Sequence, residues 1–388
     1  MVHPYRLSES DSTLLNSATT LARDVLAPNA ADVDRSARFP REGMAALAKT
    51  GLNGLCVARE MGGAGAGMRA FAAVVEELAT ACGSTAMIYN MHVVAAQAIA
   101  SGASLSGRDT LLADIAAGRH LTTLAFSERG SRSLFWTPVS RLSPNGTGFE
   151  TTADKSWVTS AHEADSFVSS VLAPAAKAPM ESTIYLVRKG AKGIAIPNGF
   201  DGLGLRGNDS APMRFERVAV TPGDLISAQG EGATTMLTVV LPWFAIGTAA
   251  IANGLCRAAV DATTRHLGSA GFETTGTQLR DLPNLRARLA EMSLRTGQSR
   301  ALLGHTLDHL DAGSPAAPLF VLQSRLAALE AATHVTDLAM KACGGAAFSR
   351  QLGVERVFRD ARAGWVMSPT TDHLLEFTGR VLTGLPLF

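Results

Sequence analysis

The pattern of hydrophobic residues changes twice along this chain, and that change limits the folds available to it. From residue 12 to about residue 118, apolar residues recur at three- and four-residue steps, as on the buried face of a helix. Short β-like runs follow between about residues 121 and 230, and helical periodicity returns from about residue 234 to the C-terminus. The sequence therefore predicts an α+β protein with a helical domain over residues 1–120, a β domain over residues 121–230 and a helical domain over residues 231–388.

Local signals mark the individual segments. Leu14, Ala18, Leu21 and Val25 form one helical face, and further helices are predicted over residues 68–80 and from 84 towards 100. Asn145-Gly146 is a strong signal for a two-residue hairpin turn. The predicted β runs cover residues 121–126, 149–151, 157–159, 166–172, 182–187 and 213–218. A composition of 46% hydrophobic and only 6% aromatic residues fits a large core built mainly from helices.

Charge and cysteine usage exclude several classes of function. The 35 basic and 34 acidic side chains are interspersed and give a net charge of +1, so neither nucleic acid nor an anionic membrane is an expected partner. No run of 18 uninterrupted apolar residues and no apolar signal core occurs, which predicts a cytoplasmic protein without a membrane span. The four cysteines lack the paired spacing of metal ligands, so no metal site is predicted.

Short motifs appear in a fixed order along nearly the whole chain. Phe39-Pro40 precedes Gly51-Leu52, and residues 60–65 form a glycine-rich loop. Residues 127–133 read Ser-Glu-Arg-Gly-Ser-Arg-Ser, and residues 155–159 read Lys-Ser-Trp-Val-Thr. Gly344-Gly345 is then followed by an Arg-Asp-Ala helix at residues 359–361. Together and in this order, these segments resemble the acyl-CoA dehydrogenases.

The resemblance implies an N-terminal helical domain, a middle β-barrel domain and a C-terminal four-helix bundle. It also implies FAD in the cleft between the β domain and the C-terminal helices, with FMN or a transient reduced flavin as alternatives. Trp157 would provide an aromatic wall, Ser127 would bond the pyrimidine edge of the ring, and Ser133 would bond a phosphate oxygen. The other cofactor contacts implied are Phe126, Val158, Thr159, Gly344, Gly345 and Thr370. The glycines at 62–67 follow no strand and form no GxGxxG pattern, so they are interpreted as structural.

The catalytic carboxylate of the family has no counterpart here. Members of the family remove an α-proton with a glutamate that lies shortly after the Arg-Asp-Ala helix, and Ser368 stands at that position. Some relatives place the base on a central helix, but residues 241–245 contain no acid. A positioned base contributes about a hundred- to ten-thousandfold in rate, which a serine hydroxyl does not replace at neutral pH. Asp372 and His92 are the candidate substitutes, with Glu376 and His373 behind them.

Two further departures concern phosphate recognition. The family's arginine that reaches the flavin diphosphate across a dimer is replaced by Phe272, and an arginine that contacts the CoA end is replaced by Ala245. Losing two bidentate phosphate partners weakens the case for tight FAD and for a CoA thioester.

Three hypotheses about function follow from these patterns. The first is a divergent dehydrogenase of an acyl-CoA or acyl-carrier thioester, which passes electrons to a partner protein. The second is a flavin-dependent monooxygenase that acts on a small molecule and receives reduced flavin from a separate reductase. The third is a non-catalytic subunit paired with a complete homologue. The Ala-rich C-terminal helices allow close helix approach, and a homodimer or homotetramer is expected.

Overall fold

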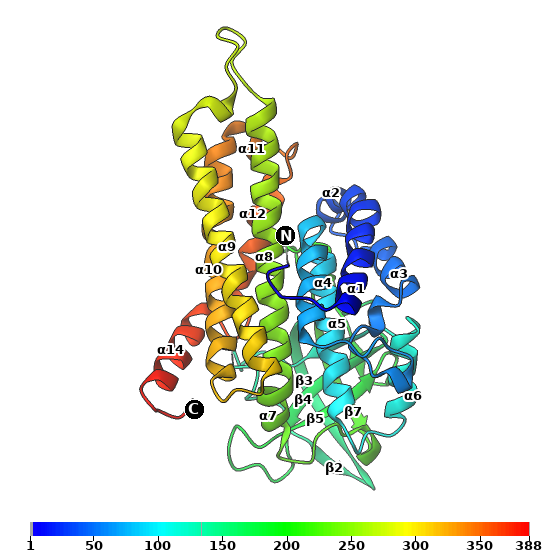
Figure 1. The fold of residues 1–388 in the computed structure, drawn as a ribbon. Coiled ribbons are helices and arrows are strands. Elements are labelled where there is room, and N and C mark those ends of the chain that lie inside the picture. The colour runs from blue at the N-terminus through cyan, green and yellow to red at the C-terminus, as the bar shows by residue number, and fades with distance from the viewer. Residues whose placement is uncertain (1–2, 133, 388) are drawn as a thin grey trace.

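The computed structural model describes residues 3–132 and 134–387, and its elements fall into the predicted order of helices, strands and helices (Figure 1). The N-terminal helices are α1 (Glu9–Leu21), α2 (Ala27–Arg35), α3 (Arg41–Lys49), α4 (Met68–Ala81), α5 (Gly83–Ser101) and α6 (Arg108–Ala116). The strands are β1 (Thr122–Ala125), β2 (Ser143–Asn145), β3 (Gly148–Val158), β4 (Ser166–Leu172), β5 (Ser182–Arg188), β6 (Ile194–Ala195) and β7 (Ala211–Val220). The C-terminal helices are α7 (Gly232–Thr235), α8 (Leu241–Ser269), α9 (Pro283–Asp311), α10 (Ala317–Cys343), α11 (Gly345–Phe348), α12 (Val354–Ala361), α13 (Ala363–Val366) and α14 (Thr371–Leu382).

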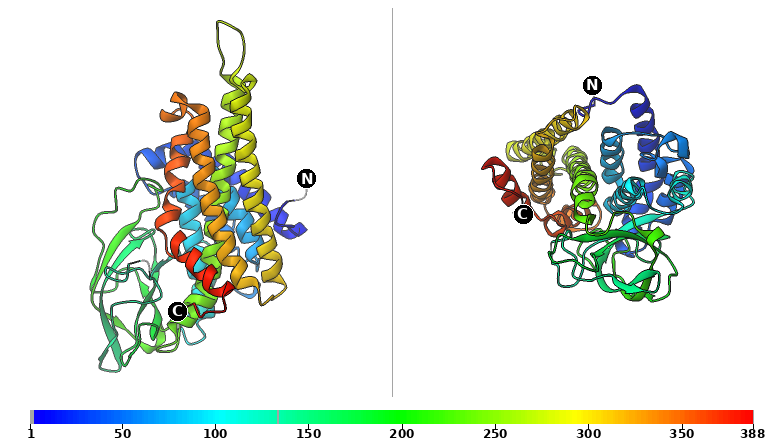
Figure 2. Two further views of the ribbon diagram at one scale, coloured as in Figure 1. Left: turned by 90° about the vertical axis from the view of Figure 1, so that its left-hand side faces the viewer. Right: turned by 90° about the horizontal axis from the view of Figure 1, so that it is seen from below.

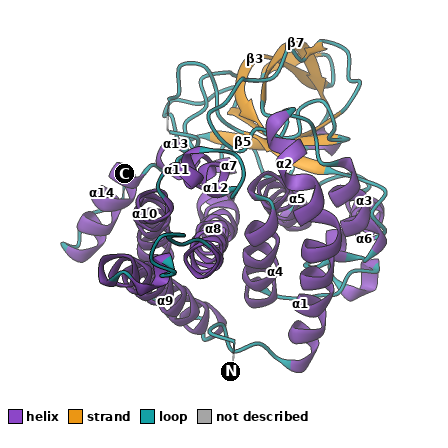
Figure 3. Cartoon of the chain, turned by 90° about the horizontal axis from the view of Figure 1, so that it is seen from above, coloured by secondary structure: helices purple, strands orange, loops and turns teal. Residues whose placement is uncertain are grey.

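The two helical groups stand side by side, and the β module lies against one side of both (Figures 2 and 3). One large core joins the groups, because α4 and α5 pack against α8. Buried polar groups reinforce this contact. Glu76 on α4 accepts from the Tyr5 hydroxyl and is paired with Arg257 on α8 at 3.0 Å and Arg300 on α9 at 2.9 Å. The N-terminal segment is therefore tied to the bundle through a buried carboxylate whose charge is compensated.

The β module consists of two sheets around a second core. Its strands are ordered β1-β4-β5 in one sheet and β2-β3-β7-β6 in the other. Phe167 and Tyr185 from the first sheet share that core with Phe215 and Val218 from the second. A hairpin is present as predicted, but its two-residue turn is Gly146-Thr147 and not Asn145-Gly146, since Asn145 pairs with Gly148 and Gly146 has a positive φ of 60°.

One strand differs from its prediction. The runs predicted at 149–151 and 157–159 belong to a single strand, β3, which continues through polar residues between them. β3 pairs along its length with β7, and its side chains alternate between the core and the surface. Thr152 and Asp154 thus belong to the solvent face of a continuous strand, which an apolar-run criterion interrupts, whereas Lys155 is buried.

The C-terminal bundle is built on α8, α9 and α10, with α12 and α14 packed against α10. A hairpin between α8 and α9 projects from the end of the bundle that is remote from the β module (Figure 1). The helical stretch Gly232–Ser269 is long and apolar enough to cross a membrane by length and composition. However, 61% of its most apolar 18-residue window is buried inside the protein, so packing at the centre of the core accounts for its hydropathy.

Candidate active site

A bulge at the end of β3 turns the Trp157 indole outward. Lys155 pairs with Met213 and Val158 pairs with Ala211, so two residues of β3 stand opposite one residue of β7. Trp157 itself has a positive φ of 55°, and its side chain is 62% exposed. The adjacent Val158 is fully buried. Bulges commonly re-aim a side chain next to a functional site, and this one presents a flat aromatic surface to the outside of the module.

The segment that contains Ser127 lies directly beside this bulge. The Ser127 carbonyl accepts a hydrogen bond from the Ser156 amide at 2.8 Å, which places Ser127 and Trp157 at neighbouring positions on paired backbone. A buried ion pair fixes the register, because the Lys155 ammonium lies 2.6 Å from Glu128 Oε1. Burial opposes ionisation of Glu128, but Lys155 and hydrogen bonds from Ser140 outweigh it and keep the pKa of this carboxyl below its usual value.

The loop between β6 and β7 connects the indole to helix α12. Phe200 stacks on Trp157 with ring centroids 3.9 Å apart and an interplanar angle of 26°. Five residues later, the Leu205 amide donates to Asp360 Oδ1 at 2.6 Å. The indole-bearing strand and the Arg-Asp helix are therefore linked through one short loop.

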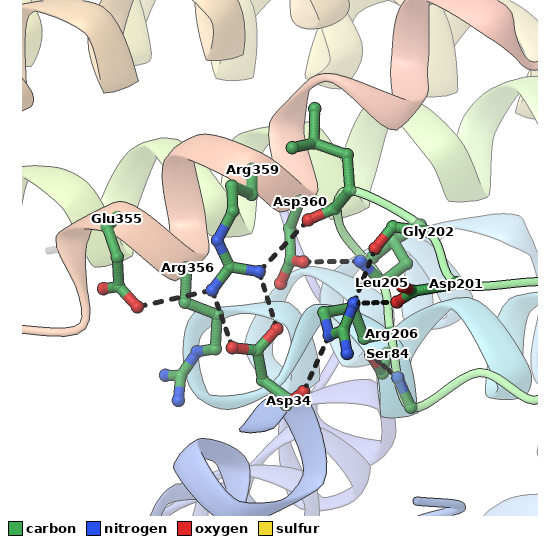
Figure 4. Close-up of polar contacts among 12 residues, drawn as sticks. Asp34, Ser84, Asp201, Gly202, Leu205, Arg206, Glu355, Arg356, Arg359 and Asp360 are labelled. Atoms are coloured by element: carbon green, nitrogen blue, oxygen red, sulfur yellow. Dashed lines mark hydrogen bonds and ion pairs between the residues drawn. The ribbon is translucent and has the colours of Figure 1, made fainter. Parts of the chain in front are cut away.

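A polar network extends this link to the N-terminal helices (Figure 4). Arg359 on α12 makes two hydrogen bonds to the carboxylate of Asp34 on α2, at 2.8 and 2.6 Å. Arg206 donates to the Asp34 carbonyl at 3.0 Å, and the Gly207 amide donates to the Ser84 hydroxyl at 3.1 Å. All three modules thus meet at one cluster, which we call the three-module network (Asp34, Ser84, Arg206, Arg359 and Asp360).

Asp360 combines this structural position with an unusual environment. Burial raises the pKa of its carboxyl to about 6. It also lines a small cavity, about 10 Å³, which is otherwise mostly apolar and lies between α5, α8, α10 and α12. Thr248, Leu329 and Met367 are among the other lining residues. The cavity has room for about one water molecule.

Aromatic side chains connect the β module to α14. The Phe126 and Phe135 rings stack with centroids 6.2 Å apart, and Phe135 contacts Trp136 at 5.1 Å. Trp136 then packs against His373 at 6.2 Å and Phe377 at 5.6 Å on α14. A row of packed rings therefore connects the segment after β1 to the helix after Ser368.

The predicted residues near the C-terminus have distinct settings. Ser368 is partly exposed, in the loop that precedes α14. Thr370 is the N-cap of α14 and accepts from the His373 amide, a local structural use of its hydroxyl. Asp372 is exposed in the first turn of α14, and Glu376 is exposed and pairs with Arg380 at 3.3 Å.

His92 lies in the interior of α5. Its Nδ1 accepts from the Thr122 amide at 3.2 Å, and its Nε2 is buried without a partner among the described residues. Burial lowers the pKa of this imidazole to about 4. His92 is therefore a neutral side chain at the contact between α5 and β1.

The remaining predicted cofactor residues lie elsewhere or outside the described chain. Gly344 and Gly345 are exposed, at the end of the bundle opposite the β module (Figure 1). Phe272, at the position where the sequence resemblance implies a phosphate-binding arginine, is an exposed residue of the α8–α9 hairpin. Ser133 lies outside the described residues. Within one chain, the structure brings Phe126, Ser127, Trp157, Val158 and Thr159 together, and it leaves the two glycines apart from them.

Sequence reasoning missed one charged side chain of this region, Arg325 on α10. The residue is 0% exposed and is the largest of the fully buried side chains. Its Nη2 donates to the Met367 carbonyl at 3.0 Å, one residue before Ser368. A signal was present in the sequence, because Arg325 shares the apolar face of its helix with Val321, Leu322, Ala328 and Leu329.

The comparisons with known proteins agree with this architecture. Residues 8–119 match the family model described as acyl-CoA dehydrogenase, N-terminal domain, and residues 230–382 match acyl-CoA dehydrogenase, C-terminal domain. The chain is 26% identical to acryloyl-CoA reductase (NADH) of Anaerotignum propionicum, over 95% of this chain and 93% of that protein. It is also 26% identical to cyclohex-1-ene-1-carbonyl-CoA dehydrogenase of Geobacter metallireducens, over 97% and 98% of the two chains.

A solved structure shows the same fold. Butyryl-CoA dehydrogenase from Megasphaera elsdenii superposes with a TM-score of 0.92 at 21% identity, covering 97% of this chain and 99% of that one. The two family models together match well over half of the chain. The protein belongs to the acyl-CoA dehydrogenase superfamily and is an oxidoreductase of that class.

Proposed function

We propose that this protein is a flavin-dependent oxidoreductase that introduces a double bond between the α and β carbons of an acyl thioester. The observation that carries the proposal is the exposed Trp157 indole beside Ser127, on the surface of the β module. Large apolar side chains exposed next to polar backbone typify sites for flat cofactors. The names of the two similar dehydrogenase and reductase proteins support an acyl-CoA substrate.

The residues around the bulge fit a flavin ring. Trp157 offers a flat face, Ser127 and Thr159 offer hydroxyl groups, and Phe126 supplies an apolar side chain, whereas the Val158 side chain belongs to the core of the β module. A bound flavin would supply the acceptor for the hydride that leaves the β carbon. FAD is the flavin that we propose, with Gly344 and Gly345 reaching it from a second subunit, since α11, which begins at Gly345, lies at the end of the bundle remote from the β module.

The proton acceptor is the unconventional part of the proposal. Ser368 occupies the place of the family's glutamate, and a hydroxyl is a poor base at neutral pH. Asp372 is the candidate closest in sequence to this loop, and its carboxylate is exposed. His92 is less suited, because its imidazole is fully buried and its pKa of about 4 makes it a weak base. Asp360 is the acid among the residues that line the adjacent cavity, with a pKa of about 6.

The test is to restore the acid with Ser368→Glu in the purified, flavin-loaded protein. If the pocket accepts thioesters, this variant will bleach the flavin absorbance with a short acyl-CoA on the order of a hundredfold faster than the wild type. Ser368→Gln is the control, since it has similar size and no base. Equal rates in the two variants, or no bleaching in any variant, would contradict the dehydrogenase assignment.

The missing acid also favours a second candidate, a monooxygenase that uses reduced flavin and oxygen and requires no α-proton base. Oxygen consumption with added reduced flavin and a small-molecule substrate, without bleaching by acyl-CoA, would identify it. A protein that gains flavin only when mixed with a homologous chain would instead be a partner subunit.

The proposal includes assembly into a homodimer or homotetramer. Large apolar side chains are exposed on the C-terminal helices, including Phe348 at 86% and Val366 at 76% exposure. Such residues commonly become buried between subunits. Light scattering coupled to size exclusion will measure the mass, and a strictly monomeric species would contradict this part of the proposal.

A further inference from the structure

Arg325 is a buried guanidinium whose hydrogen-bonding capacity is mostly unused. Of its nitrogens, Nη2 donates to the Met367 carbonyl, whereas Nε and Nη1 have no partner among the described residues. A guanidinium carries five N–H donors, so a single carbonyl leaves most of them unsatisfied. A buried donor without a partner destabilises the folded state, and an unpaired buried charge does so more strongly.

Among the described residues, no carboxylate forms an ion pair with this guanidinium. Burial alone lowers the pKa of Arg325 to about 9, without a contribution from a neighbouring charge. The guanidinium carbon lies 4.9 Å from the centre of the Phe244 ring, which is a favourable contact but supplies no hydrogen-bond acceptor. This guanidinium is therefore neutralised only when an anion from outside the chain approaches it.

The position of Arg325 places such an anion in the proposed substrate region. Helices α8 and α10 run side by side in the bundle (Figure 1). Phe244 and Arg325 face each other across them, and one turn further along each helix Thr248 and Leu329 line the small cavity. Met367 connects Arg325 to the cavity, since its carbonyl accepts from Arg325 and the residue also lines the cavity. Phe244 and Met367 are only partly buried, so the side chains that cover the guanidinium reach the surface.

The exchange at residue 368 is consistent with a negatively charged ligand. A glutamate at this position would stand one residue after the carbonyl that Arg325 holds, and it would repel an anionic group nearby. With Ser368 that repulsion is absent. The guanidinium thus lies beside a loop that has a neutral side chain at the position where the sequence resemblance implies an acid.

We propose that Arg325 binds a carboxylate carried by the substrate, so that the acyl group accepted beside Ser368 bears its own negative charge. This inference rests on the proposed function for the acyl group, and the carboxylate site itself rests on Arg325. A guanidinium binds a carboxylate through two parallel hydrogen bonds, and the unpartnered Nε and Nη1 supply donors for them.

The experiment compares matched ligands on the full-length protein. Succinyl-, glutaryl- and adipyl-CoA are paired with butyryl-, pentanoyl- and hexanoyl-CoA, which have the same chain lengths without the carboxylate. Calorimetry on the wild type should show tighter binding of at least one charged ligand than of its neutral counterpart, on the order of ten- to hundredfold. Arg325→Met should abolish that preference, and Arg325→Lys should keep part of it. The absence of a preference in all three pairs, or a preference that survives Arg325→Met, would overturn the proposal.

A control variant and a stability measurement exclude a purely structural role. Arg362→Met is the matched control, because Arg362 also belongs to the C-terminal helical module, between α12 and α13, but already donates to Thr336 at 3.0 Å and lies over the Phe358 ring. It should leave the ligand preference unchanged. Arg325→Met should not lower the Tm, since it removes an unpaired buried charge. A lowered Tm together with an unchanged ligand preference would show that Arg325 only supports the Met367 loop.

Free glutarate separates this inference from the proposed function. Arg325-dependent binding of glutarate in a protein that no acyl-CoA reduces would retain the carboxylate site and reject the thioester. Bleaching of the flavin by pentanoyl-CoA, without any preference that depends on Arg325, would retain the dehydrogenase and reject the site.

Discussion

Arg359 and Arg325 lie on neighbouring helices, α12 and α10, in opposite electrostatic settings. Arg359 binds both carboxylate oxygens of Asp34, and this pairing raises the pKa of its guanidinium above the usual value. Arg325 has one carbonyl partner, and burial lowers its pKa to about 9. The arginine that joins the three modules is therefore paired with a carboxylate of the same chain. The arginine beside Ser368 has no such partner among the described residues. We expect the ion pair of Arg359 to stabilise the folded state, and we expect Arg325 to bind a ligand.

The largest effect on this comparison is expected from Arg359→Met. The change leaves the Asp34 carboxylate largely buried without its partner, and we expect a loss of about 3 kcal/mol in the free energy of unfolding. Urea denaturation of this variant beside Arg325→Met measures the contrast. A double variant with Asp34→Asn should recover part of the loss, because the unpaired charge is then removed. Equal destabilisation by the two arginine variants would break the comparison.

The pH dependence of the free energy of unfolding tests the protonation of Asp360 within the three-module network. The carboxyl of Asp360 has a pKa of about 6 in the folded protein against 3.8 as its ordinary value. The folded state therefore holds this proton more tightly, and the associated stability is present at low pH and is lost as the pH rises through about 6. The expected loss is up to about 3 kcal/mol.

Asp360→Asn keeps an oxygen that can accept from the Leu205 amide but does not titrate. The difference in urea midpoint between this variant and the wild type should grow in favour of the variant between about pH 4 and pH 7. A difference that stays constant over that range would show that Asp360 titrates normally.

The smallest expected effect is at Trp157. Trp157→Ala should weaken flavin binding by on the order of 1–2 kcal/mol, about five- to thirtyfold in Kd, through loss of aromatic contact. Because the indole is 62% exposed, the free energy of unfolding should change little. Fluorescence titration with FAD measures the affinity, with Leu203→Ala as the control for an exposed apolar residue on the adjoining loop. Unchanged FAD affinity would show that the ring lies elsewhere.

Much of the fold followed from periodicity, because burial imposes a regular pattern on helices and strands. The run at 166–172 coincides with β4, which is buried along nearly all of its length and is therefore apolar or small throughout. The helices predicted over 68–80 and from 84 towards 100 agree with α4 and α5 within two residues. β3 was harder to predict, because its solvent face is polar and its bulge depends on pairing with β7, which is distant in sequence.

The candidate site was harder to predict from the sequence than the fold. Motif order assigned Ser127 and Trp157 to one cofactor site, a role that stays a prediction, and the structure pairs the Ser127 carbonyl with the Ser156 amide next to Trp157. The distance of Gly344 and Gly345 from Trp157 depends on how long helices carry the chain across the molecule, which motif order does not encode. Arg325 was missed because an arginine in a helical stretch is ordinarily solvent-exposed, and only its place on the apolar face distinguishes it.

The loop between β6 and β7 has a consequence for proton exchange with solvent. It carries Phe200, which covers the indole, and Leu205, whose amide bonds Asp360, only five residues apart. A ligand that displaces Phe200 from the indole would shift the loop whose Leu205 amide donates to the Asp360 carboxyl, and this hydrogen bond opposes the rise in pKa that burial causes. By thermodynamic reciprocity, ligand affinity at the indole then varies with the protonation of a carboxyl on another helix. Binding of a ligand at the Trp157 indole is then detectable as release or uptake of protons in lightly buffered solution.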